Sequence, residues 1–365
     1  MALQWFLPTT GDSRSSLMTG GATYNLEDAV NANERPADLA YLVQIAQAAE
    51  RMGFESLLIP TGSWCLDAWT VATTVASHTS KIDMLVALRQ GLISPTVQAQ
   101  MIRSFHELLG ERLRLNVVAG GESRDQRRFG DTLEKAQRYE RATEYADAVR
   151  QLVAGGHVDY AGEHIQLEDA FLPTATPMPP VYLGGSSAGA LESAAKQADV
   201  FLTWGEPVAM AVEKRARAAA AADAQGRELD YGIRLHLITR PTSEEAWAIA
   251  DKLVADIPQE QIEQAAAEFA QSGSEGQRRM ASLQTGSLSR EGLTIEPNLW
   301  AGLGLVRGGA GTTLVGSFEE VADALQRYFD AGFNQFILSG TPHLEEAYWF
   351  GEGVTPILRE RGLVA

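Results

Sequence analysis

The most constraining feature of this chain is a regular alternation of short apolar runs with amphipathic helical segments. The apolar runs have the length and the β-branched or aromatic content of strands, whereas the segments between them repeat with a helical period. The predicted strands cover residues 3–8, 56–60, 83–89, 114–121, 179–185, 200–204, 231–240 and 334–340. Because strands and helices alternate, the sheet should be parallel, and a count of eight strands favours a (β/α)8 TIM barrel.

An open, doubly wound sheet is the structural alternative. That fold commonly carries Gly-x-Gly-x-x-Gly at its first strand–helix turn, and no such turn occurs in this chain. The glycine-rich run at 302–311 has its glycines in the wrong order for this fingerprint. Residues 156–170 are predicted to form a β-hairpin that leaves the barrel.

Residues 241–333 are too long for an ordinary connection between strands 7 and 8. They contain predicted helices near 243–255 and 259–271, followed by a polar stretch at about 271–296. A stretch of this kind is either a lid or a disordered tether, and we interpret it as a mobile lid. We therefore expect a single domain over 1–365 with one large insertion.

Charge and cysteine content exclude several classes of protein. The chain has 30 Lys and Arg against 47 Asp and Glu, a net charge of -17, and no basic stripe, so a nucleic-acid partner is not expected. Its single cysteine, Cys65, rules out a disulfide framework and fits the cytoplasm. No apolar run approaches the length of a membrane span, the start does not resemble a signal peptide, and no His spacing indicates a metal site.

The seventh predicted strand carries Arg234 and His236, two residues apart and so on the same face. Their apolar neighbours would face the helices, which directs the arginine into the barrel. A buried guanidinium needs an anionic partner. That partner is either an Asp or Glu from another strand or a bound oxyanion, which arginine holds in a bidentate manner.

A second candidate site is the run Gly-Gly-Ser-Ser at 184–187, between a predicted strand and a predicted helix. Free backbone N–H groups and two hydroxyls there could hold a phosphate, although the same run is also an ordinary turn and N-cap. Trp204 and Cys65 could both be plain core residues.

Longer motifs along nearly the whole chain resemble the bacterial-luciferase-like flavin monooxygenases, and within them the alkanesulfonate monooxygenase branch. The most specific are LTWGEP (202–207), GIRLHLI (232–238), PNLWAGLGLVRGGAGTTLVG (297–316) and SGTPHLEEA (339–347). The resemblance implies a reaction in which reduced FMN and O2 cleave the C–S bond of an organosulfonate to give sulfite and an aldehyde. It also implies a separate NAD(P)H:FMN reductase and a homo-oligomer, either a dimer or a tetramer.

The resemblance assigns roles to individual residues. Residues expected at the flavin, most of them near its phosphate, are Gly185, Ser186, Ser187, Tyr139, Asn116 and Cys65. Residues expected in the catalytic pocket are Trp204, Arg234, His236, Arg307 and His343. Among these, Arg234, Arg307 and Trp204 would also contact the sulfonate. His343 lines the pocket on this interpretation, although it could instead only cap a helix that begins near Leu344.

Two positions depart from the alkanesulfonate pattern. Thr341 stands where the branch commonly has tyrosine, and Thr10 where it commonly has histidine. The loop at 12–37 is also longer than expected. These departures predict a larger and more polar substrate pocket, which suggests a bulky sulfonate such as sulfoquinovose. The alternatives are a general alkanesulfonate monooxygenase, a flavin monooxygenase acting on a non-sulfonate, and a flavin-binding protein without catalysis.

Overall fold

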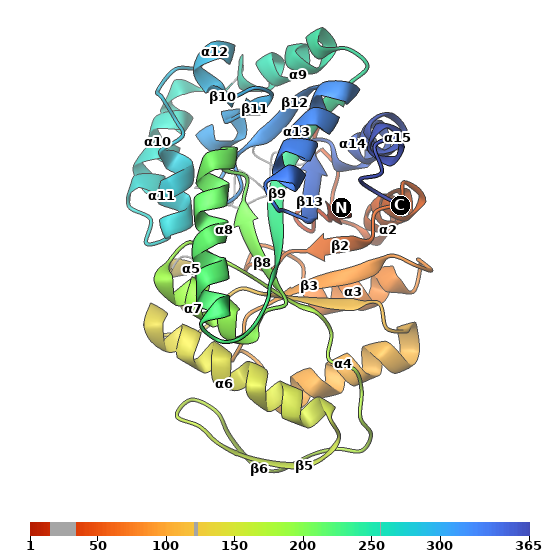
Figure 1. Ribbon diagram of the computed structural model, residues 1–365, viewed down its shortest axis with the longest axis vertical. Coiled ribbons are helices and arrows are strands. Elements are labelled where there is room, and N and C mark those ends of the chain that lie inside the picture. The colour runs from red at the N-terminus through yellow and green to blue at the C-terminus, as the bar shows by residue number, and fades with distance from the viewer. Residues whose placement is uncertain (15–33, 120–122, 256) are drawn as a thin grey trace.

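Eight parallel strands close into a barrel in the computed structural model, which describes residues 1–14, 34–119, 123–255 and 257–365 (Figure 1). The barrel strands are β1 (Ala2–Phe6), β2 (Ser56–Ile59), β3 (Asp83–Leu88), β4 (Leu113–Val117), β7 (Val181–Gly184), β8 (Val200–Trp204), β9 (Asp230–Arg240) and β13 (Gln335–Gly340). The barrel closes because β9 pairs in parallel with both β8 and β13, and β13 pairs with β1. The predicted (β/α)8 fold is confirmed.

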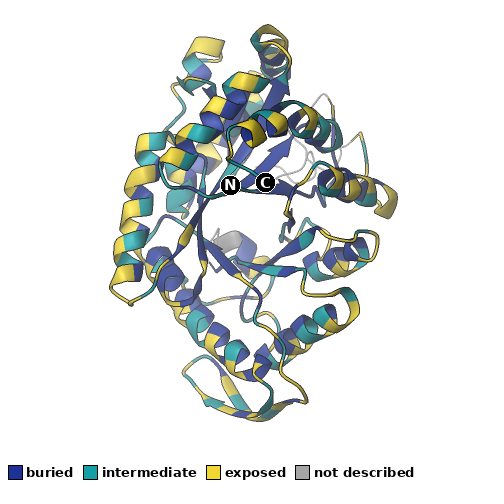
Figure 2. Ribbon diagram, turned by 45° about the vertical axis from the view of Figure 1, so that its right-hand side comes forward, coloured by how far each residue is buried: buried dark blue, intermediate teal, exposed yellow. Residues whose placement is uncertain are grey.

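Helices surround the barrel, with their buried faces toward the sheet and their exposed faces outward (Figure 2). The main ones are α2 (Leu39–Arg51), α3 (Ala68–Ala76), α4 (Pro95–Leu109), α6 (Lys135–Val153), α7 (Ala188–Gln197), α8 (Val208–Asp223), α13 (Phe318–Asp330), α14 (His343–Trp349) and α15 (Thr355–Glu360). The largest apolar cluster fills the layer between these helices and the strands. A smaller cluster of alternate strand residues, including Phe6, Tyr182 and Ile337, fills the barrel interior.

Local signals explain where several helices begin and end. Helix α4 starts with Ser94 as N-cap and Pro95 in its first turn, and it stops at Gly110, whose φ of 81° favours glycine. Helix α13 begins with a capping box between Ser317 and Glu320. The hairpin predicted at 156–170 is present as β5 (Gly156–Ala161) and β6 (Gln166–Leu172).

The sequence interpretation missed one strand. Strand β9 is long enough to pair with β8 through its first half and, from His236 to Arg240, with β12 (Thr313–Ser317) through its second half. Strand β12 has five residues, as many as β1, β4 and β8, but it directly follows the glycine-rich run at 302–311 inside the region interpreted as an insertion. Part of the expected insertion at 241–333 is therefore sheet, extended further by β11 (Leu299–Trp300) and β10 (Thr294–Glu296).

The rest of that insertion is helical. It contains α9 (Ser243–Ala255), α10 (Gln259–Ala270), α11 (Glu275–Ala281) and α12 (Arg290–Leu293). Helix α9 contributes Trp247 and Leu253 to an apolar cluster with Trp300 and Val306, which joins the insertion to the barrel rim. The polar stretch at 271–296 thus forms two short helices here, while its motion as a lid stays a prediction.

Most of the predicted long loop at 12–37 lies outside the described residues, but its two ends meet. Asp12 and Arg35 form an isolated antiparallel bridge beside α2.

Within the described part of the chain, no helix has the length and apolar character needed to cross a bilayer. The same residues contain no cluster of side chains suited to a metal ion.

Candidate active site

A cavity of about 220 Å³ opens at the carboxyl ends of the barrel strands, where TIM barrels place their sites. Its walls come from β2, β4, β7, β8, β9 and β13 and from the N-terminal ends of α6 and α11. Seven of the residues predicted from the sequence line it: Asn116, Tyr139, Gly185, Ser186, Ser187, Trp204 and Arg234. The structure therefore brings most of the expected flavin residues together with two of the expected catalytic residues.

The end of the cavity beneath α7 is built for a small anion. Ser187 is the N-cap of α7, and the Tyr139 hydroxyl hydrogen-bonds to its side chain. A Cβ on Gly185 would lie 2.5 Å from Ala190 Cβ, so only glycine lets the backbone turn this tightly into the helix. Lys135 also lines this cavity. Helix N–H groups, hydroxyls and a lysine together fit the phosphate of a flavin mononucleotide.

Helix α11 covers one side of the cavity. Ser274, Glu275 and Gly276 line it, and a Cβ on Gly276 would lie 3.0 Å from the Trp204 ring. Further along the same segment, Gln277 Oε1 accepts a hydrogen bond of 2.8 Å from the backbone N–H of Gly309. Because Gly309 lies two residues after Arg307, α11 contacts both the cavity and the loop that carries this arginine.

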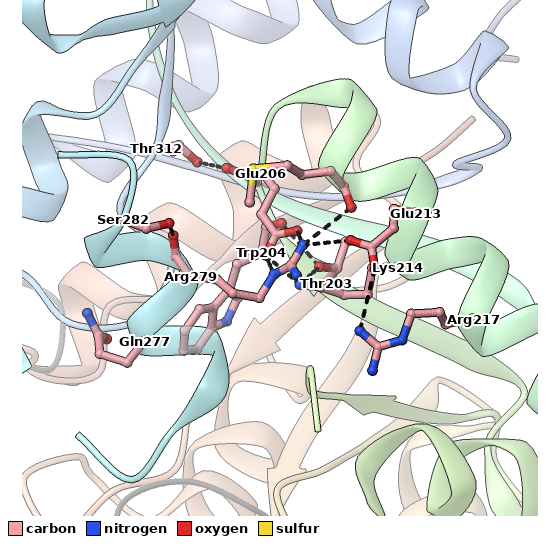
Figure 3. Close-up of polar contacts among 12 residues, drawn as sticks. Thr203, Trp204, Glu206, Glu213, Lys214, Arg217, Gln277, Arg279, Ser282 and Thr312 are labelled. Atoms are coloured by element: carbon pink, nitrogen blue, oxygen red, sulfur yellow. Dashed lines mark hydrogen bonds and ion pairs between the residues drawn. The ribbon is translucent and has the colours of Figure 1, made fainter. Parts of the chain in front are cut away.

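A buried ion cluster fastens α11 to the barrel (Figure 3). Arg279 makes a bidentate contact with Glu206, at 2.7 Å from Nε to Oε1 and 2.8 Å from Nη2 to Oε2. Lys214 Nζ lies 2.6 Å from the same Oε1, and both Glu206 and Lys214 are almost fully buried. A carboxylate between two cations keeps its charge balanced in the low-dielectric interior.

Arg234 enters the barrel interior, as its spacing with His236 predicted. Its guanidinium lies 4.1 Å from the centre of the Phe6 ring, and its buried Nη1 has no hydrogen-bond partner among the described residues. Burial and the charge of Arg307 lower the pKa of Arg234 to about 9. No carboxylate of the described residues pairs with it or acts on its pKa, so the alternative of a buried Asp or Glu partner on another strand is not realised.

Arg307 is a second buried cation whose charge acts on Arg234; it does not line the cavity, and only 3% of it is exposed. Its Nε and Nη1 atoms have no hydrogen-bond partner among the described residues. Burial lowers the pKa of Arg307 to about 10, although the charge of Asp12 opposes this. Two buried guanidiniums with unused N–H groups are costly in the free protein and form a strong site for an oxyanion.

His236 is held at both ring nitrogens. Nε2 lies 3.0 Å from the Ala310 carbonyl oxygen, which can only accept, so Nε2 carries the proton. Nδ1 then accepts from the Ser339 hydroxyl at 2.8 Å. Burial, followed by the charges of Arg307 and Arg234, lowers the pKa of His236 well below its usual value. This neutral ring fixes the loop that follows Arg307.

His343 is the first residue of α14 and follows the cis Thr341–Pro342 peptide bond. The N-cap of this helix is Pro342, and the His343 side chain bonds elsewhere: its Nδ1 lies 3.1 Å from Asp12 Oδ1. The ring is 1% exposed and packs beside Phe6, with 5.6 Å between ring centres. The interpretation of His343 as only a helix cap is therefore wrong.

Cys65, Thr10 and Thr341 lie outside the lining of the cavity. Burial raises the pKa of the Cys65 thiol to about 11, partly opposed by a hydrogen bond from Thr9. Thr341 is 6% exposed, and its hydroxyl has no partner among the described residues. Thr10 is half-buried in the turn after β1.

The sequence interpretation missed Asp12, Lys135 and Glu206, and it expected α11 only as part of a lid at about 271–296, without naming its contacts. Glu206 lies inside the quoted motif at 202–207. A charged residue two positions after Trp204, in an otherwise uncharged motif, was the available signal. Asp12 and His343 are 331 residues apart, and only the closure of the barrel between β1 and β13 brings them together.

The structure is thus a closed (β/α)8 barrel whose strand ends carry a cradle suited to an anion, a covering helix and two buried arginines. A sequence model described as luciferase-like monooxygenase matches residues 1–335. The chain therefore belongs to the luciferase-like monooxygenase family.

Solved structures agree at the level of the fold. The match to a riboflavin lyase, solved with modified FMN and riboflavin, covers 100% of this chain and 92% of that chain, at 20% identity and a TM-score of 0.78. EDTA monooxygenase from Chelativorans sp. BNC1 matches at 18% identity and a TM-score of 0.77, covering 100% of this chain and 95% of its own. DmoA from Hyphomicrobium sulfonivorans matches at 19% identity and a TM-score of 0.78, and the match covers 100% of this chain and 88% of that chain.

Proposed function

We propose that this protein is a monooxygenase that uses reduced FMN and O2 to cleave the C–S bond of an organosulfonate, releasing sulfite and an aldehyde. The observation that carries the proposal is the pair Arg234 and Arg307, buried together without a carboxylate partner in the described chain. A sulfonate supplies three acceptor oxygens and one negative charge, which match the unused N–H groups of two guanidiniums. A neutral substrate would leave Arg234 without a compensating charge and Arg307 with only that of Asp12, with which it forms no ion pair.

The cavity fits FMN as the cofactor. Ser186, Ser187, Tyr139 and Lys135 would hold its phosphate, and Asn116 on β4 would lie beside the ring system. When bound in its reduced form, the flavin supplies the electrons that activate O2. Because the chain has no nicotinamide fingerprint, a separate NAD(P)H:FMN reductase would deliver the reduced flavin.

The side chains around the flavin would bind the substrate, exclude water and position the loop of Arg307. Arg234 and Arg307 orient the sulfonate and stabilise the negative charge that passes to the leaving sulfite. Trp204 and α11 close the cavity on one side and exclude water. His236 contributes by holding the Ala310 carbonyl, and with it the loop of Arg307.

Within the sulfonates, we propose a bulky polar substrate such as sulfoquinovose. The resemblance implies a tyrosine in the alkanesulfonate branch at the position of Thr341, whose buried hydroxyl has no partner among the described residues; a smaller side chain with a free hydroxyl supports a hydroxylated carbon skeleton. A general alkanesulfonate monooxygenase remains the second candidate, since Arg234 and Arg307 recognise only the sulfonate group.

The test combines the protein with FMN, a flavin reductase, NAD(P)H and O2, and measures sulfite from sulfoquinovose, ethanesulfonate and octanesulfonate. Sulfite from sulfoquinovose with a higher kcat/KM than from either alkanesulfonate is the expected result. Sulfite from the alkanesulfonates alone would refute the substrate but keep the reaction. No sulfite from any sulfonate would refute the reaction and favour a non-sulfonate substrate or a flavin-binding protein without catalysis.

A further inference from the structure

We propose that Glu275, the first residue of α11, opposes the phosphate of the flavin by like charge and so keeps flavin binding weak enough for exchange. The inference rests on the proposed use of FMN and adds to it a residue that controls how tightly the phosphate is held. Glu275 is not part of the site predicted from the sequence.

Glu275 lies at the phosphate end of the cavity, where it lines the wall together with the residues proposed to hold the phosphate. It follows Ser274, the N-cap of α11. The next residue shows how close this turn comes to the cradle, because a Cβ on Gly276 would lie 3.6 Å from Ser186 Oγ. The first turn of α11 therefore packs directly beside the cradle.

The charge of Glu275 is unusual in this place. Among the described residues that line the cavity it is the one carboxylate, against the two cations Lys135 and Arg234. Its charge also reaches the cradle: burial raises the pKa of the Tyr139 hydroxyl, and Glu275 adds to this rise, while a hydrogen bond with Ser187 opposes it. A phosphate beside Tyr139 would thus meet the same field.

No cation of the described residues forms an ion pair with Glu275. Lys214 and Arg279, which fasten α11 to the barrel, both pair with Glu206 instead. Glu275 is half-buried, so its charge is screened less than a charge on the open surface. A phosphate dianion in the cradle would therefore experience a repulsion that no neighbouring ion pair cancels.

This repulsion suits a flavin that is reduced on another protein. Such a flavin must leave after each turnover, and tighter binding generally means slower release. The helix N–H groups and hydroxyls of the cradle favour the phosphate, and Glu275 limits how much they favour it. The effect falls on the phosphate alone, because riboflavin has the same ring system and ribityl chain without that charge.

The variant Glu275→Gln removes the charge and keeps the shape of the side chain. The measurement is the Kd for oxidised FMN and for riboflavin, followed by flavin fluorescence as protein is titrated into each. We expect the ratio of the riboflavin Kd to the FMN Kd to rise roughly 10-fold, through tighter binding of FMN. This readout needs neither turnover nor a sulfonate.

The matched control is Glu291→Gln. Glu291 is exposed on α12 in the same inserted region but does not line the cavity, so this variant makes the same change in net charge away from the cradle. Its ratio of the two Kd values should equal that of the natural protein. Loss of a carboxylate from the first turn of α11 also weakens the helix slightly, but that effect acts on both flavins and leaves the ratio unchanged.

An unchanged or lowered ratio in Glu275→Gln overturns this inference and leaves the proposed function standing. In particular, weaker binding of both flavins by the same factor would show that Glu275 accepts hydrogen bonds from the ribityl hydroxyls. An equal rise of the ratio in Glu291→Gln would mean that net charge, and not the place of Glu275, controls binding. If neither flavin binds the natural protein, the proposed use of FMN is overturned as well.

Discussion

Arg234 and Arg307 lower the stability of the ligand-free protein and raise its affinity for an anion. Each guanidinium is buried, each has its pKa lowered mainly by that burial, and neither has a carboxylate partner among the described residues. Burying these unpaired charges destabilises the ligand-free protein, and a bound oxyanion removes this destabilisation by pairing with them. Sites built this way are often less stable than their surroundings.

The substitution Arg234→Met should therefore act in opposite directions on stability and activity. We expect the free energy of unfolding without ligand to rise by about 1–2 kcal/mol, because one of two like buried charges is replaced by an apolar chain. The kcat/KM for sulfite release should fall roughly 100-fold or more. Urea denaturation and a sulfite assay measure the two effects.

Arg361→Met is the control for this experiment, since Arg361 already pairs with Glu319 and Asp323 on the surface. It should bring no gain in stability and no loss of activity. If Arg234→Met were destabilising and still active, Arg234 would be a structural residue.

Cys65 should behave as a neutral thiol. Burial raises its pKa to about 11, so the thiolate that reacts with alkylating agents is scarce at pH 8. Iodoacetamide labelling of the native protein at pH 8 should be roughly 100-fold slower than labelling in urea. The chain has one cysteine, so mass spectrometry reads this residue without background.

The variant Cys65→Ser provides the second half of this test and should keep sulfite release within about threefold. Fast native labelling together with an inactive serine variant would indicate a nucleophilic cysteine instead.

At the level of elements, the contact of α11 with the barrel depends on Arg279. Its bidentate contact with Glu206 is buried on the carboxylate side, and Lys214 keeps that carboxylate paired when Arg279 is absent. Arg279→Met should therefore loosen α11 without unfolding β8. We expect the Kd for FMN, followed by flavin fluorescence, to rise roughly 10-fold, equivalent to about 1.4 kcal/mol.

The matched control is Arg290→Met, because Arg290 forms an ion pair with Asp251 in the same inserted region but away from the cavity lining. Its Kd for FMN should not change. Equal effects of the two variants would mean that the inserted region acts only through its overall stability.

Sequence periodicity predicted the barrel well because each βα unit carries its own signal. The predicted β8 at 200–204 matches Val200–Trp204 residue for residue, and β9 differs by one residue. Strand β12 had no such signal, since its partner is the second half of β9 and this pairing is a tertiary property. The same reason hid the contact between Asp12 and His343, which forms only when β1 and β13 pair to close the barrel.

At the level of the whole molecule, the net charge of -17 opposes the arrival of an anionic substrate. The screening length falls from about 30 Å at 0.01 M salt to about 8 Å at 0.15 M, which weakens this long-range repulsion more than the short contacts with buried arginines. The KM for a sulfonate should therefore fall as potassium chloride is raised over this range. A series of sucrose at matched osmolarity controls for effects of crowding and should leave KM unchanged.

Strand β9 pairs with β8 through its first half and with β12 through its second half, so two different segments meet along one strand at the barrel rim. One strand carries Arg234 in the half that closes the barrel and His236 where β12 joins, so the register of β12 determines where Arg307 lies. In the segment between β9 and β12, α9 packs against β12 and Gln277 of α11 accepts from the Gly309 backbone N–H, so these two contacts help to hold the Arg307 loop. Evolution, or an engineer, could thus vary the rest of this segment between relatives and change which molecules enter, provided that these two contacts are kept.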